Sequence, residues 1–302
     1  DANLHVEGNA YVSSNLHVSG NAYVSSNLEV GNSLFPTWFQ TIQGTSSDSG
    51  RSIAVDSSGN VYATGFYNST TTPVSLGNGL ELPASAATDV YIVKYNSSGT
   101  AQWFQTIRGT SNDVGYGIAV DSGGNVYATG YYNSTVSLGN GLNLPVPTGS
   151  DAFIVKYDTS GTAQWYQTIV GSASDRGNAI AVDSGGNVYV TGYYNSTTTV
   201  SLGNNLNLPV TSVNDVYIVK YDTSGTAQWF QTIPGTSNDS GFGIAVDSSG
   251  SVYVTGEYYS GSTVSLGNGL NLPVSTGYDV FIVKYSFNPI FFIDVTTARV
   301  DV

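Results

Sequence analysis

The stretch Ile118-Ala-Val-Asp-Ser-Gly-Gly-Asn-Val-Tyr-Ala-Thr-Gly130 places two short apolar segments on either side of a polar turn. Its β-branched and aromatic residues favour strands, and the turn at 121–125 supplies glycines for positive backbone angles. Close variants of this phrase occur four times along the 302-residue chain. The aspartates that open the four turns are Asp56, Asp121, Asp183 and Asp247. The phrase therefore predicts a strand pair that is repeated four times.

Two further phrases recur with it. One reads Trp-(Phe/Tyr)-Gln-Thr-Ile and begins at Trp38, Trp103, Trp165 and Trp229. The other reads Asp-x-(Tyr/Phe)-Ile-Val-Lys-Tyr and contains Lys94, Lys156, Lys220 and Lys284. No stretch has the apolar period of about 3.6 residues that marks a helix. Four antiparallel strands per unit are typical of a propeller blade.

Each unit also holds more sequence than a blade of about 40–50 residues requires. The excess lies between the second and third strands, in Val-Ser-Leu-Gly-Asn-Gly-Leu-x-Leu-Pro or a close variant. Asn-Gly is a strong signal for a two-residue hairpin turn. The dipeptides at this place are Asn78-Gly79, Asn140-Gly141, Asn204-Asn205 and Asn268-Gly269. We therefore expect an additional hairpin on every blade.

These repeats predict an all-β fold, a four-bladed β-propeller over residues 35–288. The Trp phrase at 38–42 precedes the first repeat, and none follows the last Lys strand at 281–285. We therefore expect the N-terminal Trp strand to complete the last blade and close the ring, which would leave no broken blade. The alternatives are a larger ring built from several chains, or an open stack.

A shorter repeat occupies the N-terminus. Residues 3–32 divide into five hexads such as Asn-Leu-His-Val-Glu-Gly, with apolar side chains on one face by period two. Five hexads bury too little surface to stand alone. Residues 1–34 are therefore predicted to form a β-stalk that assembles with copies of the same chain, as a homotrimer; a short single-chain β-helix is the alternative. Residues 289–302 are predicted to be a C-terminal β segment that returns to this stalk.

Composition excludes several classes of protein. The net charge is −13, only 10% of residues are charged, and Cys is absent. Four Lys and four Arg cannot neutralise a run of phosphates or dock on an anionic membrane. Without Cys there is no disulfide framework or thiol nucleophile. No apolar run approaches the ~20 residues of a membrane helix. The chain opens on Asp1 without a signal peptide, so we expect a processed or truncated N-terminus.

The long unit resembles the bacterial-type β-propeller repeat known as SBBP. The matching pattern is Ile-Ala-Val-Asp-x-x-Gly-Asn-Val-Tyr-x-Thr-Gly, followed by Asp-x-(Phe/Tyr)-Ile-Val-Lys-Tyr-Asp-x-x-Gly-x-x-x-Trp, over residues 38–285. The resemblance implies a propeller and says little about activity. The flanks, Ser26-Asn-Leu-Glu-Val-Gly31 and 291–300, resemble stalk repeats in fibre-like proteins of large DNA viruses. That second resemblance implies a propeller inserted between the two halves of a stalk.

Aspartates at one repeat position are the candidate metal ligands. This set is Asp48, Asp113, Asp175 and Asp239. A further set, Asp89, Asp151, Asp215 and Asp279, precedes each repeated Lys by five residues. If one set lined a central channel, four carboxylates could bind Ca²⁺ through oxygen ligands. The alternative is that these aspartates accept backbone N–H bonds in turns. No other cofactor is expected.

Nothing in the sequence assembles into catalytic machinery. His5 and His17 both lie in the hexads, so they could form a metal ring in a trimeric stalk or simply face outward. Neither can join a Ser-His-Asp set in the propeller. The repeated lysines are interpreted as structural, paired with the Asp five positions earlier or with a neighbouring blade. Arg51, Arg108 and Arg176 fall at different repeat positions and form no obvious anion clamp. We therefore expect no enzyme activity.

Sequons suggest an exposed protein. Asn-x-Ser/Thr occurs at Asn68, Asn96, Asn133, Asn195 and Asn238. They are candidate glycosylation sites, although Asn and Ser are common in such loops. The four Trp could be sugar platforms or could anchor the packing between blades.

Together these features predict a non-enzymatic structural and attachment protein. It would be a fibre-like component of a virion surface or cell surface that displays a β-propeller head for glycan or protein binding. Its partners would be its own copies and other virion or surface proteins, without nucleic acid or membrane insertion. The alternatives are a glycan-active propeller enzyme and a purely architectural capsid component.

Overall fold

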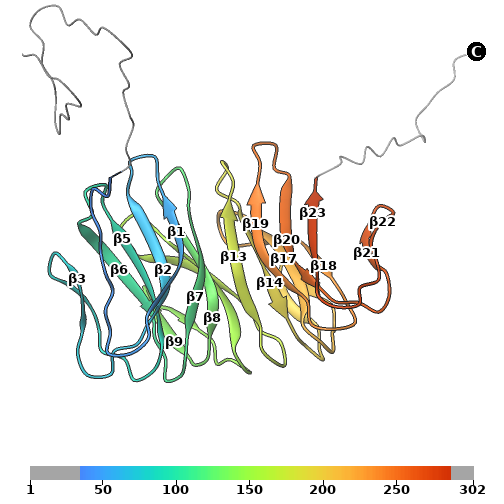
Figure 1. Ribbon diagram of the computed structural model, residues 1–302, viewed down its shortest axis with the longest axis horizontal. Coiled ribbons are helices and arrows are strands. Elements are labelled where there is room, and N and C mark those ends of the chain that lie inside the picture. Colours follow the sequence, from blue (N-terminus) through green and yellow to red (C-terminus); the bar gives the residue numbers. More distant parts are fainter. Residues whose placement is uncertain (1–34, 287–302) are drawn as a thin grey trace, which may run out of the picture. The chain divides into compact units, whose positions relative to one another are not determined.

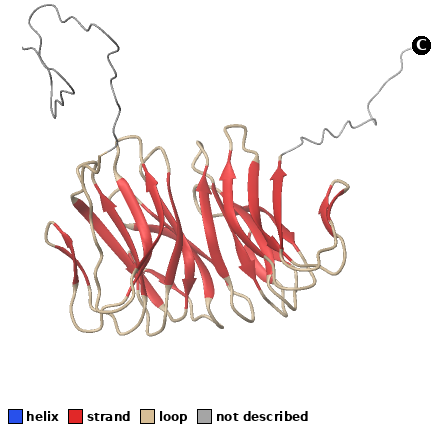
Figure 2. Ribbon diagram, in the orientation of Figure 1, coloured by secondary structure: helices blue, strands red, loops and turns tan. Residues whose placement is uncertain are grey.

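A computed structural model describes residues 35–286, which contain 23 β-strands joined by loops (Figures 1 and 2). The chain divides into two compact units, residues 1–37 and 38–302, and every described strand belongs to the second. No helix that could cross a membrane occurs in residues 35–286. The predicted stalk (1–34) and the C-terminal segment (289–302) lie outside the described residues.

The strands form four antiparallel sheets in chain order, which we call blades 1 to 4. Blade 1 contains β1 (Ser49–Val55), β2 (Val61–Tyr67), β5 (Asp89–Tyr95) and β6 (Ala101–Ile107). Blade 2 contains β7 (Val114–Val120), β8 (Val126–Tyr132), β11 (Asp151–Tyr157) and β12 (Ala163–Ile169). Blade 3 contains β13 (Arg176–Val182), β14 (Val188–Tyr194), β17 (Asp215–Tyr221) and β18 (Ala227–Ile233). Blade 4 contains three strands, β19 (Ser240–Val246), β20 (Val252–Tyr258) and β23 (Asp279–Tyr285).

The additional hairpin predicted for each blade is confirmed. The pairs are β3 (Val74–Gly77) with β4 (Leu80–Leu82), β9 (Val136–Gly139) with β10 (Leu142–Leu144), β15 (Val200–Gly203) with β16 (Leu206–Leu208), and β21 (Val264–Gly267) with β22 (Leu270–Leu272). Asn78 and Gly79 at the first turn both have positive φ, at 53° and 72°, as a two-residue hairpin requires. The Asn78 amide also donates to the carbonyl of Ala101, which fastens the hairpin to the fourth strand of its own blade.

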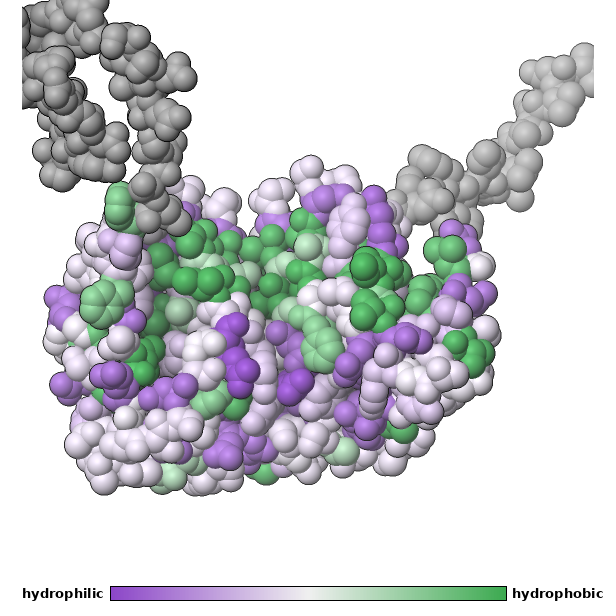
Figure 3. All heavy atoms as spheres, viewed as in Figure 1, coloured by the Kyte–Doolittle hydropathy of each residue, from purple (hydrophilic) through white to green (hydrophobic). Residues whose placement is uncertain are grey.

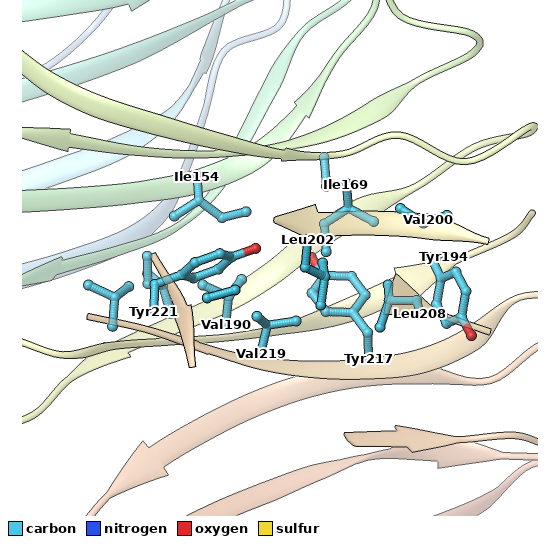
Figure 4. Close-up of a cluster of buried hydrophobic side chains, with 14 of the residues drawn as sticks. Ile154, Ile169, Val190, Tyr194, Val200, Leu202, Leu208, Tyr217, Val219 and Tyr221 are labelled. Carbon is cyan, nitrogen blue, oxygen red and sulfur yellow. The ribbon is translucent and has the colours of Figure 1, made fainter. Parts of the chain in front are cut away.

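Apolar residues between consecutive blades form the core. The first strand of each following blade packs on the sheet before it, so that β7 contacts β1 and β2, and β13 contacts β7 and β8. Figure 4 shows such a junction, with Ile154 of β11 above Val190 and Tyr221 of blade 3. Since both faces of blades 2 and 3 are covered, their second and third strands are buried along almost their whole length.

The structure does not show the predicted closure of the ring. Residues 38–42 are not in a strand and do not pair with β23, whose only described partner is β20. They lie against blade 1 instead, where the Trp38 ring is 6.2 Å from that of Tyr95 and Gln40 donates to the carbonyl of Gly99 at 2.8 Å. These contacts hold the Trp phrase on the blade that follows it. The blades therefore form an open array from β1 to β23 (Figure 1).

Candidate functional site at the blade junctions

The turn at one end of each blade uses its aspartate to organise the loop. Asp56 accepts hydrogen bonds from the backbone N–H of Ser58 and Asn60, from the Asn60 amide and from the Tyr62 hydroxyl, all at 2.8–2.9 Å. Burial alone would raise the pKa of Asp56, but these donors stabilise the carboxylate and lower it. Asp121 and Asp183 make the same four contacts. These aspartates are therefore structural.

The repeated lysines lie beside the same tyrosines. The Lys94 ammonium is 5.3 Å from the centroid of the Tyr62 ring, its cross-strand neighbour, and the other three repeats place their Lys–Tyr pairs at 5.2–5.4 Å. Such cation–π contacts stabilise exposed sites by roughly 0.5–1 kcal/mol. Lys94 and Asp89 lie towards opposite ends of β5, so the pairing of each lysine with the aspartate five positions earlier, which the sequence suggested, does not form there. Lys156 does reach the neighbouring blade, where it donates to the carbonyl of Thr223.

Pairs of buried carboxyl groups occupy the opposite end of each internal junction. The pairs are Asp89 with Asp113, Asp151 with Asp175, and Asp215 with Asp239. All six residues are buried. A backbone hydrogen bond of 2.6–2.7 Å joins the blades at each pair, for example from the Asp113 N–H to the carbonyl of Thr88. Desolvation raises the pKa of the first member of each pair to about 6 and that of the second to about 7.

The two members of a pair have different surroundings. Asp113 accepts the N–H groups of Gly109 and Asn133 at 2.8–2.9 Å, and so fastens the loop before β7 to the end of β8. Asp48 binds Gly44 and Asn68 in the same way. By contrast, neither carboxyl oxygen of buried Asp89 has a hydrogen-bond partner.

The structure separates the four candidate metal ligands. Asp113, Asp175 and Asp239 belong to three different junctions, and Asp48 lies on the open side of blade 1. Within residues 35–286 no three His, Cys, Asp or Glu side chains gather at one place that could hold a metal ion. Cation binding at these positions stays a prediction. The pairing of these aspartates with Asp89, Asp151 and Asp215 was not predicted from the sequence. Each of those three residues precedes its partner by the same 24 residues.

The predicted sequons differ in accessibility. Asn238 is exposed, whereas Asn68, Asn96, Asn133 and Asn195 are half-buried. The side-chain amides of Asn133 and Asn195 donate to Asn112 and Asn214. Glycosylation stays a prediction for all five. His5 and His17 lie outside the described residues.

The tryptophans are placed between blades. Trp103 packs against Tyr62 of its own blade and Tyr157 of the next, with centroids 6.3 and 6.4 Å away, and its indole N–H donates to the carbonyl of Thr159. Trp165 repeats these contacts one blade later. These contacts agree with a role in packing between blades rather than with the sugar-platform role that the sequence also suggested.

Two arginines converge on one tyrosine, which the sequence did not suggest. Arg51 of β1 and Arg176 of β13 lie 5.5 and 4.6 Å from the ring centroid of Tyr116 on β7. The Arg176 guanidinium also donates to the Tyr116 hydroxyl and lies 5.0 Å from the Tyr193 ring. Tyr131 lies 6.1 Å from Tyr116. We call these five residues the arginine–tyrosine cluster.

The cluster departs from the repeat. Arg51 and Tyr116 occupy one repeat position on neighbouring first strands, where blades 3 and 4 have Asn178 and Phe242. Arg176 corresponds to Ser49, Val114 and Ser240. The three residues are far apart in the sequence, and Arg176 stands at a different repeat position from Arg51 and Tyr116, so only the packing of β1, β7 and β13 brings them together. Guanidinium groups beside partly exposed aromatic rings can bind a carboxylate and stack on a planar or sugar face.

The fold defines a repeat protein built from propeller-like blades. Residues 38–65, 164–197 and 228–257 match the SBBP family, described as Beta-propeller repeat. These three segments are thus similar to SBBP β-propeller repeats, as the resemblance implied. The predicted stalk lies outside the matched residues.

Two curated proteins are distantly related to the chain. An uncharacterized WD repeat-containing protein of Acanthamoeba polyphaga mimivirus is 28% identical over 243 residues, which are 70% of this chain and 18% of that protein. The regulatory protein FlaEY of Caulobacter vibrioides is 27% identical over 217 residues, 70% of this chain and 22% of FlaEY. The chain therefore spans about a fifth of the length of each of these relatives.

Proposed function

We propose that this chain is a non-enzymatic attachment protein whose propeller head binds acidic glycans at the arginine–tyrosine cluster, displayed on a virion or cell surface. One observation carries the proposal: two arginines that break the repeat, Arg51 and Arg176, converge on Tyr116, whereas the polar groups repeated in every blade build turns and junctions. Carboxylated sugars match the cluster, because guanidinium groups bind carboxylates bidentately and tyrosine rings pack against sugar faces. The relationship to a mimivirus protein is compatible with a virion location.

Replacing Arg51 and Arg176 by methionine should weaken binding to sialylated or uronic-acid glycans by about tenfold or more, since hydrogen bonds to a charged group contribute about 1.5–3 kcal/mol. Titration of the purified protein against a carboxylated oligosaccharide measures the affinity. Arg108→Met is the matched control, because Arg108 donates to the carbonyl of Ala84 away from the cluster. Equal affinity of all three proteins for the glycan would contradict the assignment, and turnover of the glycan would indicate an enzyme instead.

The proposal places the head on the oligomeric stalk predicted from the hexads. The described residues are compatible with that arrangement, because Trp38 packs at the turn end of blade 1 and β23 ends at the turn end of blade 4. Deleting residues 1–34 is therefore expected to reduce the particle mass to about one third of that of the intact assembly, as measured by multi-angle light scattering. An unchanged number of chains per particle would contradict the stalk.

A further inference from the structure

We propose that the two open ends of the blade array are the two halves of one blade junction, and that a second copy of this chain completes it head to tail. In this arrangement β1 of one copy packs on blade 4 of the other, and residues 38–42 supply the strand that blade 4 lacks. Three independent features of the described residues carry the inference.

The first feature is apolar surface at both ends. At the internal junctions Ile118 of β7 is 5% exposed and packs with Val90 and Ile92 of β5, which are fully buried. The equivalent residue at the first end is Ile53, which is 68% exposed. At the last end the equivalents of Val90 and Ile92 are Val280 and Ile282, at 74% and 80% exposed. Figure 3 shows hydrophobic surface over these strands.

The second feature is a close fit between a glycine and a threonine. At internal junctions a Cβ added to Gly177 or Gly241 would lie 3.1 or 3.2 Å from the Cβ of Thr129 or Thr191, and would overlap the threonine hydroxyl. Only glycine allows this approach. Gly50 occupies the same position at the first end, yet its missing side chain would meet only the Tyr91 hydroxyl, at 3.5 Å. Its counterpart at the last end is Thr255, which is exposed although Thr129 and Thr191 are buried.

The third feature is that the Trp phrase at 38–42 pairs with no sheet, while blade 4 has no fourth strand among residues 35–286. Ile42 packs into the apolar cluster of blade 1, as Ile107 of β6 packs into the cluster between blades 1 and 2. A groove of about 330 Å³ remains beside it, lined by Trp38, Ile53 and Tyr95. The chain after β23 reads Ser-Phe-Asn-Pro-Ile at 286–290 and does not repeat the Gly-Thr-Ala-Gln-Trp phrase that leads into the fourth strands.

The geometry of the internal junctions favours pairing of the two ends with a second copy of the chain over pairing of the two ends of one chain with each other. All three use the same isoleucine, the same glycine–threonine fit and the same inter-blade hydrogen bond of 2.6–2.7 Å. Together they leave β1 and blade 4 without a shared interface. A fourth junction of the same kind therefore adds a blade beyond β23. Two arrays make eight blades, within the usual range for propellers, and a two-fold axis satisfies all four ends.

Cysteine cross-linking tests the junction directly, because the natural chain has no Cys. The double variant Gly50→Cys/Thr255→Cys should form a disulfide between copies and migrate as a covalent dimer without reductant. The control variant Gly177→Cys/Thr129→Cys places the same pair at an internal junction, where the Cβ separation of 3.1 Å is close to the ~3.5–4.5 Å of a disulfide. It should form a bond within one chain.

Each result of the cross-linking decides the question. A monomer whose two thiols have been consumed would show closure within one chain and overturn the proposal, and so would a monomer with both thiols free while the control is oxidised. Mixing the single variants Gly50→Cys and Thr255→Cys should give only heterodimers, which verifies the head-to-tail direction. With the three-chain stalk predicted from the hexads, pairing of the heads joins two stalks into a particle of six chains, and Gly50→Val should halve its mass. Glycan affinity at the arginine–tyrosine cluster tests the proposed function and is measured separately.

Discussion

Replacing Gly177 with valine should lower the melting temperature of this protein by about 6–12 °C or prevent it from folding. The new Cβ would overlap the hydroxyl of Thr129 in the preceding blade. Thr129 cannot withdraw, because it is fully buried and donates to the carbonyl of Phe153 at 2.7 Å. Blades 2 and 3 would have to separate, so we expect a cost at the upper end of the usual ~1–3 kcal/mol for overpacking, about 3 kcal/mol or more. Differential scanning calorimetry measures the loss, at about 2–4 °C per kcal/mol for a domain of this size.

Gly277→Val is the matched control for this experiment. Gly277 has no heavy atom within 4 Å of its would-be Cβ and no positive φ, so we expect a melting temperature within about 2 °C of that of the natural protein. If both variants melted at the same temperature, the two blades would not approach as closely at Gly177 as described.

Local phrases predicted the blades because each phrase carries its own turn chemistry. The Asp121 turn, the Asn78-Gly79 hairpin and the apolar run of β11 are each determined by residues adjacent in the sequence. The junctions also follow from the sequence in part, since glycine recurs at Gly115, Gly177 and Gly241. Glycine is required there because a threonine of the preceding blade lies against it, and that contact is apparent only in the folded structure.

Closure could not be predicted, because the Trp38 contacts are the same in a closed ring and in an open array. Trp38 and Gln40 bind blade 1, which follows them in the sequence. Those contacts do not depend on which blade, if any, lies on the other side of residues 38–42. The rotation between blades depends on side chains packed across three junctions, which no single repeat encodes. For the same reason Arg51 and Arg176 looked unrelated in the sequence, although β7 places Tyr116 between them.

The protein should be more stable at pH 5 than at pH 8.5. The six paired carboxyl groups have folded pKa values of about 6 to 7, above the value of about 3.9 for an unfolded aspartate. Between these values the folded protein binds more protons than the unfolded chain, so stability falls as the pH rises. Their contribution is complete below about pH 4 and is lost as the pH rises through 6 to 7.

The turn aspartates act in the opposite direction at lower pH. Hydrogen bonds lower the pKa of Asp121, Asp158 and Asp183 despite the opposing effect of burial, so their contribution is present above about pH 4 and is lost on further acidification. Maximum stability is therefore expected between about pH 4 and 6. A loss of only ~2 kcal/mol by pH 8.5 would lower the melting temperature by about 4–8 °C.

Asp151→Asn should remove part of this pH dependence. The asparagine oxygen can still accept the Thr148 N–H, and its amide can donate to Asp175, which already accepts N–H groups from Gly171 and Asn195. The variant then keeps a hydrogen-bonded pair without a second buried charge. It should melt several degrees above the natural protein at pH 8.5 and differ little from it at pH 5. Asp158→Asn, in an exposed turn, is the control: it should lower the melting temperature slightly at both pH values and leave their difference unchanged. A melting temperature of Asp151→Asn below that of the natural protein at pH 8.5 would contradict this account. It would indicate that both carboxyl groups of the pair are ionised at that pH and bind a cation. Dialysis against a chelator would then destabilise the natural protein but not the variant.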